Sequence, residues 1–202
     1  AEDLEEGVPI DPAKLSMTTT SVTVKEAGKA VEVTETAILT NIDGTMDEAG
    51  RQIGLSIADK LDIDYLASMA ETLLTFNKTA TSAENIIDAI ALFNDEDEEE
   101  YILFINPEDY TALYKEMVVG NTFLTKAQLA ELLGLKAIER TKRVAAGTSY
   151  IQKQGAVEIV YKKRPEVKPG EDILARTVVL VGNTFYTTNL YNEGGVIKMK
   201  AS

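Results

Sequence analysis

After an irregular, acidic lead-in at residues 1–14, apolar and polar residues alternate in two runs that flank a short turn. The runs cover residues 17–25 and 29–38, and the turn between them is Glu26-Ala27-Gly28. The apolar positions that share one face are Val22, Val24, Val31 and Val33. Alternation over runs of this length is typical of half-buried strands, so we expect a β-hairpin here.

Such a hairpin needs a second surface on which to lie. An isolated two-stranded hairpin is marginally stable in water, and four valines bury little area. Two arrangements are compatible with the pattern: the hairpin packs on its own domain, or it reaches another subunit. The alternation alone does not choose between them.

The next pattern predicts one long helix. Thr45 and Glu48 form a T-x-x-E capping box, and no proline interrupts the chain from there to about Leu74. Apolar residues recur at helical spacing, at Ile53, Ile57, Leu61, Tyr65, Leu66, Met69, Ala70 and Leu73. A helix of this extent is roughly 42 Å long, so it acts as a strut. Gly50 and Gly54, one turn apart, indicate either a frayed helix start or a notch for another backbone.

The rest of the chain alternates capped helices with strands and then becomes rich in strands. Helices are expected after Thr81, after Asn106-Pro107 and after Thr125. Strands are expected at 101–105, 137–144, 150–152, 156–167, 173–181, 184–191 and 196–199. Pro169-Gly170 is expected to turn the chain, and Gly182-Asn183 to join a second hairpin. This order predicts an α+β fold.

Composition removes several function classes. The 202 residues contain neither cysteine nor histidine, which excludes thiol nucleophiles and nearly excludes Ser-His-Asp triads and zinc sites. No run approaches a membrane span, and no phosphate-binding glycine loop is present. We therefore expect no catalytic residues, no cofactor, no metal and no membrane partner.

Charge is spread unevenly along the chain. The formal net charge is −13; residues 1–120 carry 26 acids and 7 bases, and residues 121–202 carry 7 acids and 13 bases. Either this difference is accidental, or opposite ends of neighbouring subunits attract each other in a head-to-tail array.

Two charged clusters carry competing interpretations. Asp95-Glu96-Asp97-Glu98-Glu99-Glu100 is a solvated loop or, less favoured, a divalent-cation site. The basic cluster Lys162-Lys163-Arg164 with Lys168 is a solvated strand end, an intersubunit salt bridge or a loose contact with packaged DNA.

The order of these parts resembles the tailed-bacteriophage major capsid protein, whose fold is shared with encapsulin shells and herpesvirus capsid floor domains. The segments that carry the resemblance are 7–15 (GVPIDPAKL), 21–36 (SVTVKEAGKAVEVTET), 48–54 (EAGRQIG), 57–60 (IADK), 105–107 (INP), 145–148 (AAGT) and 172–177 (DILART). Together they span essentially the whole chain.

The resemblance implies a division of the chain into functional parts. These are a lead-in and extended β-hairpin loop at 1–40, a spine helix of the peripheral domain at 45–78, an axial domain at 80–155, and the long peripheral strands with closing C-terminal strands at 156–202. In such proteins the extended loop crosses a neighbouring subunit. Intersubunit contacts are thus expected at Val22, Val24, Lys25, Lys29, Val31 and Val33. The family's N-terminal arm is expected to be missing from this sequence.

The function that the resemblance implies is structural. Pentamers and hexamers of the chain would build an icosahedral phage or prophage head around double-stranded DNA, bound without sequence specificity. Scaffolding and portal proteins are expected partners, and the protein would assemble in the bacterial cytoplasm and reside in the virion. The alternatives are an encapsulin-type compartment shell and, less favoured, a carboxylate-based metal-binding module.

Overall fold

A computed structural model describes residues 21–40, 44–96, 99–118 and 124–201 of the chain. The strands are β1 Lys25–Thr34, β2 Leu74–Phe76, β3 Tyr101–Ile105, β4 Ala137–Arg140, β5 Thr148–Lys153, β6 Val157–Asp172, β7 Thr177–Leu190 and β8 Val196–Lys200. The helices are α1 Glu35–Leu39, α2 Thr45–Met69, α3 Ala83–Ala91, α4 Pro107–Met117 and α5 Lys126–Leu132, with a 3₁₀ turn at Glu193–Gly195. The predicted α+β class is confirmed.

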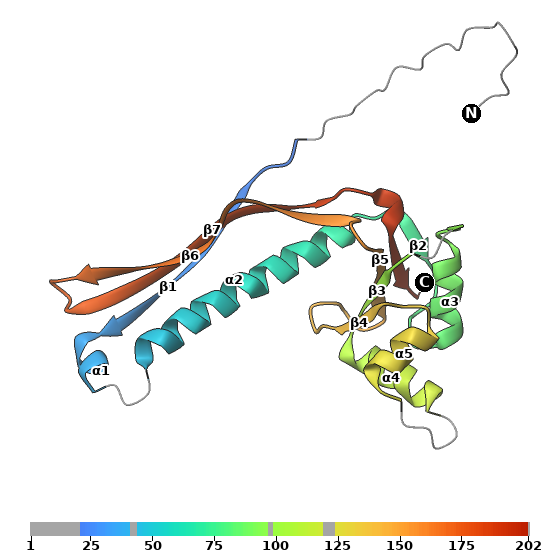
Figure 1. The fold of residues 1–202 in the computed structure, drawn as a ribbon, viewed down its shortest axis with the longest axis horizontal. Coiled ribbons are helices and arrows are strands. Elements are labelled where there is room, and N and C mark those ends of the chain that lie inside the picture. Colours follow the sequence, from blue (N-terminus) through green and yellow to red (C-terminus); the bar gives the residue numbers. More distant parts are fainter. Residues whose placement is uncertain (1–20, 41–43, 97–98, 119–123, 202) are drawn as a thin grey trace, which may run out of the picture.

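The elements form a compact unit and a long arm that projects from it (Figure 1). The compact unit holds a five-stranded sheet in the order β2-β8-β5-β3-β4, in which β2–β8 and β3–β4 are parallel pairs. Helices α3, α4 and α5 supply the other half of its core. The largest fully buried side chains of this core are Ile86, Leu103, Ile105, Leu113, Leu129, Ile138, Ile151, Ile197 and Met199.

The arm is a three-stranded antiparallel sheet in the order β1-β7-β6, with α2 along one face. Its core is small and consists of Val33, Ala49, Ile53, Ile57 and Leu180. The 25 residues of α2 make roughly 37 Å of helix, which agrees with the predicted strut. Because α2 covers one face only, the other face and both edge strands of the arm have no cover from within the described chain.

Local capping explains where the shorter helices begin. The side chain of Asn106 accepts a hydrogen bond from the backbone of Glu108, with Pro107 in the first turn of α4. Thr125 and Gln128 form the predicted reciprocal capping box of α5. At α2 the prediction shifts by one residue, because Gly44 in a left-handed conformation occupies the N-cap position and Thr45 is already helical.

The predicted hairpin around Glu26-Ala27-Gly28 is wrong. β1 runs straight from Lys25 to Thr34 through that tripeptide and pairs along its whole length with β7. The predicted turns at Pro169-Gly170 and Gly182-Asn183 are wrong as well, because β6 and β7 pass through them unbroken. The chain reverses instead at residues 173–176, between β6 and β7.

Glycines in this sheet allow neighbouring segments to pack closely; they do not form turns. A Cβ on Gly182 would lie 2.2 Å from Ile53 Cγ2, so only a residue without a side chain lets α2 pack here. A Cβ on Gly28 would come within 2.8 Å of the Gly182 carbonyl oxygen. Gly28 and Gly182 therefore lie where a side chain would collide, with β7 in the case of Gly28 and with α2 in the case of Gly182.

Candidate functional site

A buried polar seam joins α2 to the arm. Asp64, 6% exposed, accepts hydrogen bonds from Lys60 Nζ and from Tyr186 Oη, both at 2.7 Å, and Tyr186 is fully buried. One turn further, Ser68 donates to the Thr188 hydroxyl at 2.8 Å. Buried charge is costly unless it is paired, so this seam fixes the position of the helix along β7.

The seam holds its two titratable partners in opposite protonation states. Burial by itself raises the pKa of Asp64, but the hydrogen bonds from Lys60 and Tyr186 and the charge of Lys25 outweigh it and hold that pKa below its usual value. Burial, and then the hydrogen bond to Asp64, raises the pKa of Tyr186. At neutral pH an ionised carboxylate therefore faces a protonated phenol.

The predicted contact residues divide between the surface and the interior. Val22 and Val24 precede β1 and are 41% and 40% exposed, so they are available to a partner. Val33 is 6% exposed and packs in the arm's own core, and Val31 is partly buried against the same core. The prediction that the four valines share one face of a hairpin is wrong, because β1 pairs with β7 and turns Val31 and Val33 toward α2. That Val22 and Val24 contact a neighbouring subunit stays a prediction.

The two predicted lysines belong to the α2 side of the sheet. Lys29 Nζ donates to Ser56 Oγ at 2.9 Å, and Lys25 pairs with Tyr186 in the sheet, where its charge acts on Asp64. Both lysines thus contribute to the chain's own helix–sheet junction. That they contact a neighbouring subunit stays a prediction.

The predicted notch on α2 is open. A Cβ on Gly50 or on Gly54 would meet no heavy atom within 4 Å. Neither glycine is therefore needed for packing among the described residues. Their use by another backbone stays a prediction.

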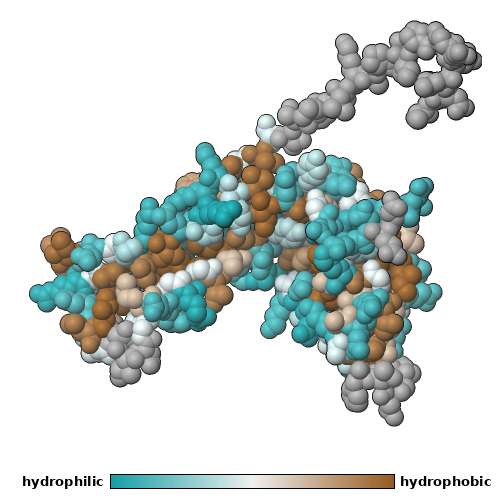
Figure 2. All heavy atoms as spheres, viewed as in Figure 1, coloured by the Kyte–Doolittle hydropathy of each residue, from teal (hydrophilic) through white to brown (hydrophobic). Residues whose placement is uncertain are grey.

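The tip of the arm carries the most exposed aliphatic residues, which the sequence reasoning missed. Ile173 is 85% exposed, Leu174 is 98% exposed, and Leu39 of the adjoining α1 is 80% exposed. The tip is nevertheless ordered, since Asp172 Oδ1 accepts hydrogen bonds from the backbone of Leu174 and Ala175. Figure 2 shows apolar surface along the arm and at this far end.

The acidic run is anchored rather than free. Asp95 accepts hydrogen bonds from Lys153 Nζ at 2.5 Å and Tyr101 Oη at 2.6 Å, and Glu100 pairs with Lys136. These hydrogen bonds lower the pKa of Asp95; burial, together with Asp95, raises the pKa of Tyr101 to about 12. Asp97 and Glu98 lie outside the described residues.

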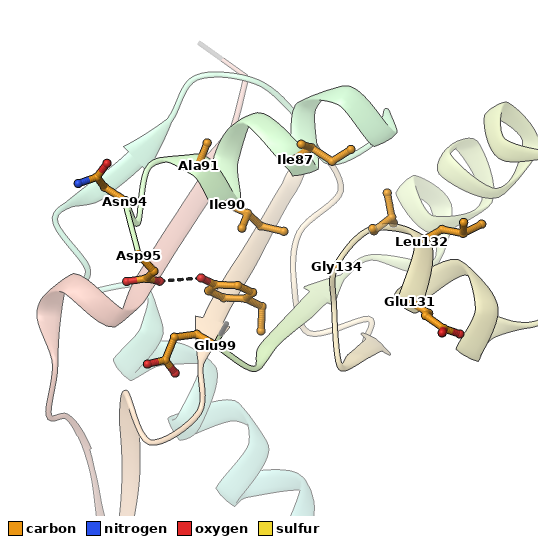
Figure 3. Close-up of a pocket in the computed structure, with 11 residues that line it drawn as sticks. Ile87, Ile90, Ala91, Asn94, Asp95, Glu99, Glu131, Leu132 and Gly134 are labelled. Atoms are coloured by element: carbon orange, nitrogen blue, oxygen red, sulfur yellow. Dashed lines mark hydrogen bonds between the residues drawn. The ribbon is translucent and has the colours of Figure 1, made fainter. Parts of the chain in front are cut away.

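Beside this run, α3 and α5 enclose a groove of about 1020 Å³. Figure 3 shows Ile87 and Ile90 on the α3 side and Leu132 with Glu131 on the α5 side, while Asp95 and Glu99 belong to the chain that leaves α3. The groove therefore has an apolar floor and an acidic rim.

The described residues hold no group of three or more Asp, Glu, His or Cys side chains placed to bind a metal ion. Among the same residues, no helix combines the length and apolarity needed to cross a membrane. The arrangement is instead one of surfaces: an exposed apolar tip, a bare sheet face and an acidic groove.

Comparison with known sequences agrees with this picture. A family profile described as phage capsid protein matches residues 17–199. The major capsid protein of Staphylococcus phage phiMR11 is 30% identical over 207 residues, covering 98% of this chain and 75% of that protein.

Solved structures show the same fold at low sequence identity. The capsid structure of the cyanophage P-SCSP1u matches with a TM-score of 0.67 and 14% identity, over 96% of this chain and 81% of that one. The encapsulin SrpI of Synechococcus elongatus matches with a TM-score of 0.61 and 11% identity, over 88% and 73%. At such identities the likeness concerns the fold alone.

Proposed function

This chain belongs to the phage capsid protein family and is a structural protein of the capsid shell, and we propose that its copies tile an icosahedral phage head around double-stranded DNA. A head of this kind needs pentamers and hexamers, assembled in the bacterial cytoplasm with scaffolding and portal proteins. DNA would be held without sequence specificity. The role is structural, with no catalytic step assigned to the chain.

The observation that carries the proposal is the arm. Its sheet has a helix on one face only, and its tip presents Ile173 and Leu174 at 85% and 98% exposure on an ordered turn. Exposed aliphatic side chains on a fixed scaffold favour burial against another molecule. Many copies in contact through such arms would form an extended shell.

We further propose that the compact unit, residues 80–155 with β2 and β8 completing its sheet, is the axial domain. The helix within 45–78 and the long strands within 156–202 would form the peripheral domain, and residues 1–40 would include the extended loop. The exposed pair Val22 and Val24, with Lys25 and Lys29 beside them, lies where that loop would leave the arm. Gly50 and Gly54 offer open helix surface to a neighbour.

A single added charge at the tip tests the proposal. Leu174→Asp should abolish assembly, measured by light scattering and electron microscopy, and leave the melting temperature nearly unchanged because the side chain touches nothing. Ala112→Asp on the exposed face of α4 is the matched control and should assemble normally. Normal shells from Leu174→Asp would contradict the proposed role of the tip.

The alternative function, an encapsulin-type compartment shell, is supported by similarity of fold, but its sequence similarity is weaker than that to a phage head protein. The encapsulin likeness is 11% identical, against 30% for the phage head protein. Shells purified from the native host would separate the two, since a head contains DNA and a compartment contains a protein cargo.

A further inference from the structure

The groove between α3 and α5 has an apolar floor that the chain itself does not cover. Ile87 is 53% exposed and Leu132 is 60% exposed, on opposite walls. Ile90 and Leu133, which also line the groove, belong to or pack against the core of the compact unit, so the floor of the groove is anchored to that core. Large aliphatic side chains gathered in one concave surface are typical of a docking site.

The rim of the groove has acidic charge without a partner. Asp95 is neutralised by Lys153, and Glu100 by Lys136. Glu99 and Glu131, both exposed, form no ion pair among the residues that the structure describes. A ligand for this groove therefore combines apolar contact with positive charge.

The arm carries a segment with this chemistry. β6 is an edge strand, and its pairing with β7 is interrupted by register shifts between Tyr161 and Lys163 and between Lys163 and Glu166. Such bulges turn side chains out of the sheet. Lys162 and Arg164 lie in the interrupted stretch, exposed and without an ion pair in the described chain, whereas Lys163 is held by Glu166 and Asn183.

Apolar surface accompanies these cations. Val160 is 47% exposed and Tyr161 is 40% exposed, immediately before the basic residues. Tyr161 lies beside Tyr186 on the α2 side of the sheet, so Val160 points to the opposite, uncovered face. The segment 160–164 thus offers one partly exposed apolar side chain on that face, followed by two positive charges without an ion pair among the described residues. It matches the groove in both respects.

One molecule cannot bring the two surfaces together. β6 lies in the arm against β7 and α2, whereas α3 and α5 lie in the compact unit, away from the arm (Figure 1). The contact must therefore join different copies. Because the two surfaces differ, it is heterologous and leads to rings or extended arrays rather than closed dimers.

We infer that the α3–α5 groove of one copy receives the bulged β6 segment, residues 160–164, of a second copy. Lys162 and Arg164 meet Glu99 and Glu131, while Val160 covers Ile87 and Leu132. This inference rests on the proposed shell function and names one of the contacts that would build it.

Charge reversal on each side tests the pairing. The arm variant Lys162→Glu/Arg164→Glu and the groove variant Glu99→Lys/Glu131→Lys should each weaken self-association at least about tenfold at low salt, measured by sedimentation velocity. A mixture of the arm and groove variants would restore only those contacts in which a reversed arm meets a reversed groove. Both reversals are therefore also combined in one chain, where every contact again joins opposite charges and association should recover. Lys115→Glu/Lys142→Glu changes the net charge by the same amount as the arm variant; it is the control for that variant and should associate as the unaltered chain does.

Introduced cysteines give an independent test, because the chain has none. A chain carrying Leu132→Cys and Arg164→Cys should give a ladder of oligomers with a short bis-maleimide, since the contact is head-to-tail. Each single-cysteine variant should stop at dimers formed slowly by collision. Equal yields from the single and double variants would overturn the inference.

The outcomes separate this inference from the proposed function. If the unaltered chain forms shells but the combined reversal does not recover and no ladder forms, the shell function stands and this contact is wrong. If the groove variant loses assembly and the arm variant does not, another basic partner occupies the groove and the inference falls. An unaltered chain that stays monomeric at every concentration overturns both.

Discussion

The compact unit and the arm bury apolar surface to very different degrees. The compact unit encloses its core between a five-stranded sheet and three helices, and nine large side chains there are fully buried. The arm relies on one helix, five buried residues and a polar seam around Asp64 and Tyr186. A unit with its own core can fold alone, whereas a sheet covered on one face leaves surface for other molecules.

The largest effect should come from the core of the compact unit. Ile151→Ala removes a fully buried side chain from the central strands and should lower the free energy of unfolding by about 2–5 kcal/mol. Urea unfolding followed by circular dichroism measures it. If Ile151→Ala lowered the free energy of unfolding no more than Ile173→Ala does at the exposed tip, the two regions would not differ in burial as described.

Substitutions of the arm's valines should have two different effects on stability, according to whether the valine is buried or exposed. Val33→Ser loses a buried side chain and should cost about 2 kcal/mol, because burial of Val contributes about 1.5–3 kcal/mol. Val22→Ser with Val24→Ser should change stability by less than about 0.5 kcal/mol, as is usual at the surface. Thermal melting of both variants checks this, and equal losses would contradict the assignment of β1.

Alanine substitutions of the glycines should also have two different effects on stability, according to the space around each glycine. Gly182→Ala places a methyl group 2.2 Å from Ile53 and should cost about 1–3 kcal/mol through overpacking. Gly54→Ala is the matched control: the same methyl enters open space on α2 and should stabilise the helix by up to about 1 kcal/mol. A neutral Gly182→Ala would show that α2 does not press on β7. If Gly54→Ala folds well yet blocks assembly, the predicted notch is a subunit contact.

The last prediction concerns the polar seam. Tyr186→Phe removes one hydrogen bond to the ionised Asp64 carboxylate, which keeps its bond from Lys60, and should cost about 1.5–3 kcal/mol at neutral pH. Because the pKa of Asp64 is lowered on folding, the stability that this carboxylate contributes is present above its unfolded pKa and is lost as pH falls through its folded pKa.

The stability difference between Tyr186→Phe and the unaltered chain should therefore shrink in acid. Urea titrations at several pH values measure it. A difference that stays constant from neutral to acidic pH would show that the seam does not depend on the ionised Asp64.

Local signals along the chain predicted the helices well and the strand connections poorly. Asn106-Pro107 and the Thr125–Gln128 box specify helix starts because the capping contacts lie within four residues. Gly28 and Gly182 were mistaken for turns because a glycine in a strand indicates either a reversal or a close neighbour. The neighbour, Ile53 for Gly182, lies 129 residues away in sequence and leaves no local trace.

The candidate contacts show the same limit. Exposure of Val22 and Val24 agrees with the alternation, but burial of Val33 depends on which strand β1 pairs with. The apolar tip at Ile173 and Leu174 could not be recognised, because a short apolar pair is more often an element of the core than an exposed turn. The acidic run was expected to be solvated, and Lys153 and Lys136 hold it at both ends.

The sequence by itself determined the α+β class, the long helix, the absence of histidine and cysteine chemistry, and the resemblance to capsid proteins. Each of these follows from composition or from contacts between residues near each other in the chain. The tertiary structure alone decided that β1 joins β7 rather than folding back, that the arm turns at residues 173–176, and that an acidic groove and a basic strand edge lie in different parts of the molecule. Those features depend on the register between strands distant in sequence, which is set by packing against α2 and not by local preference.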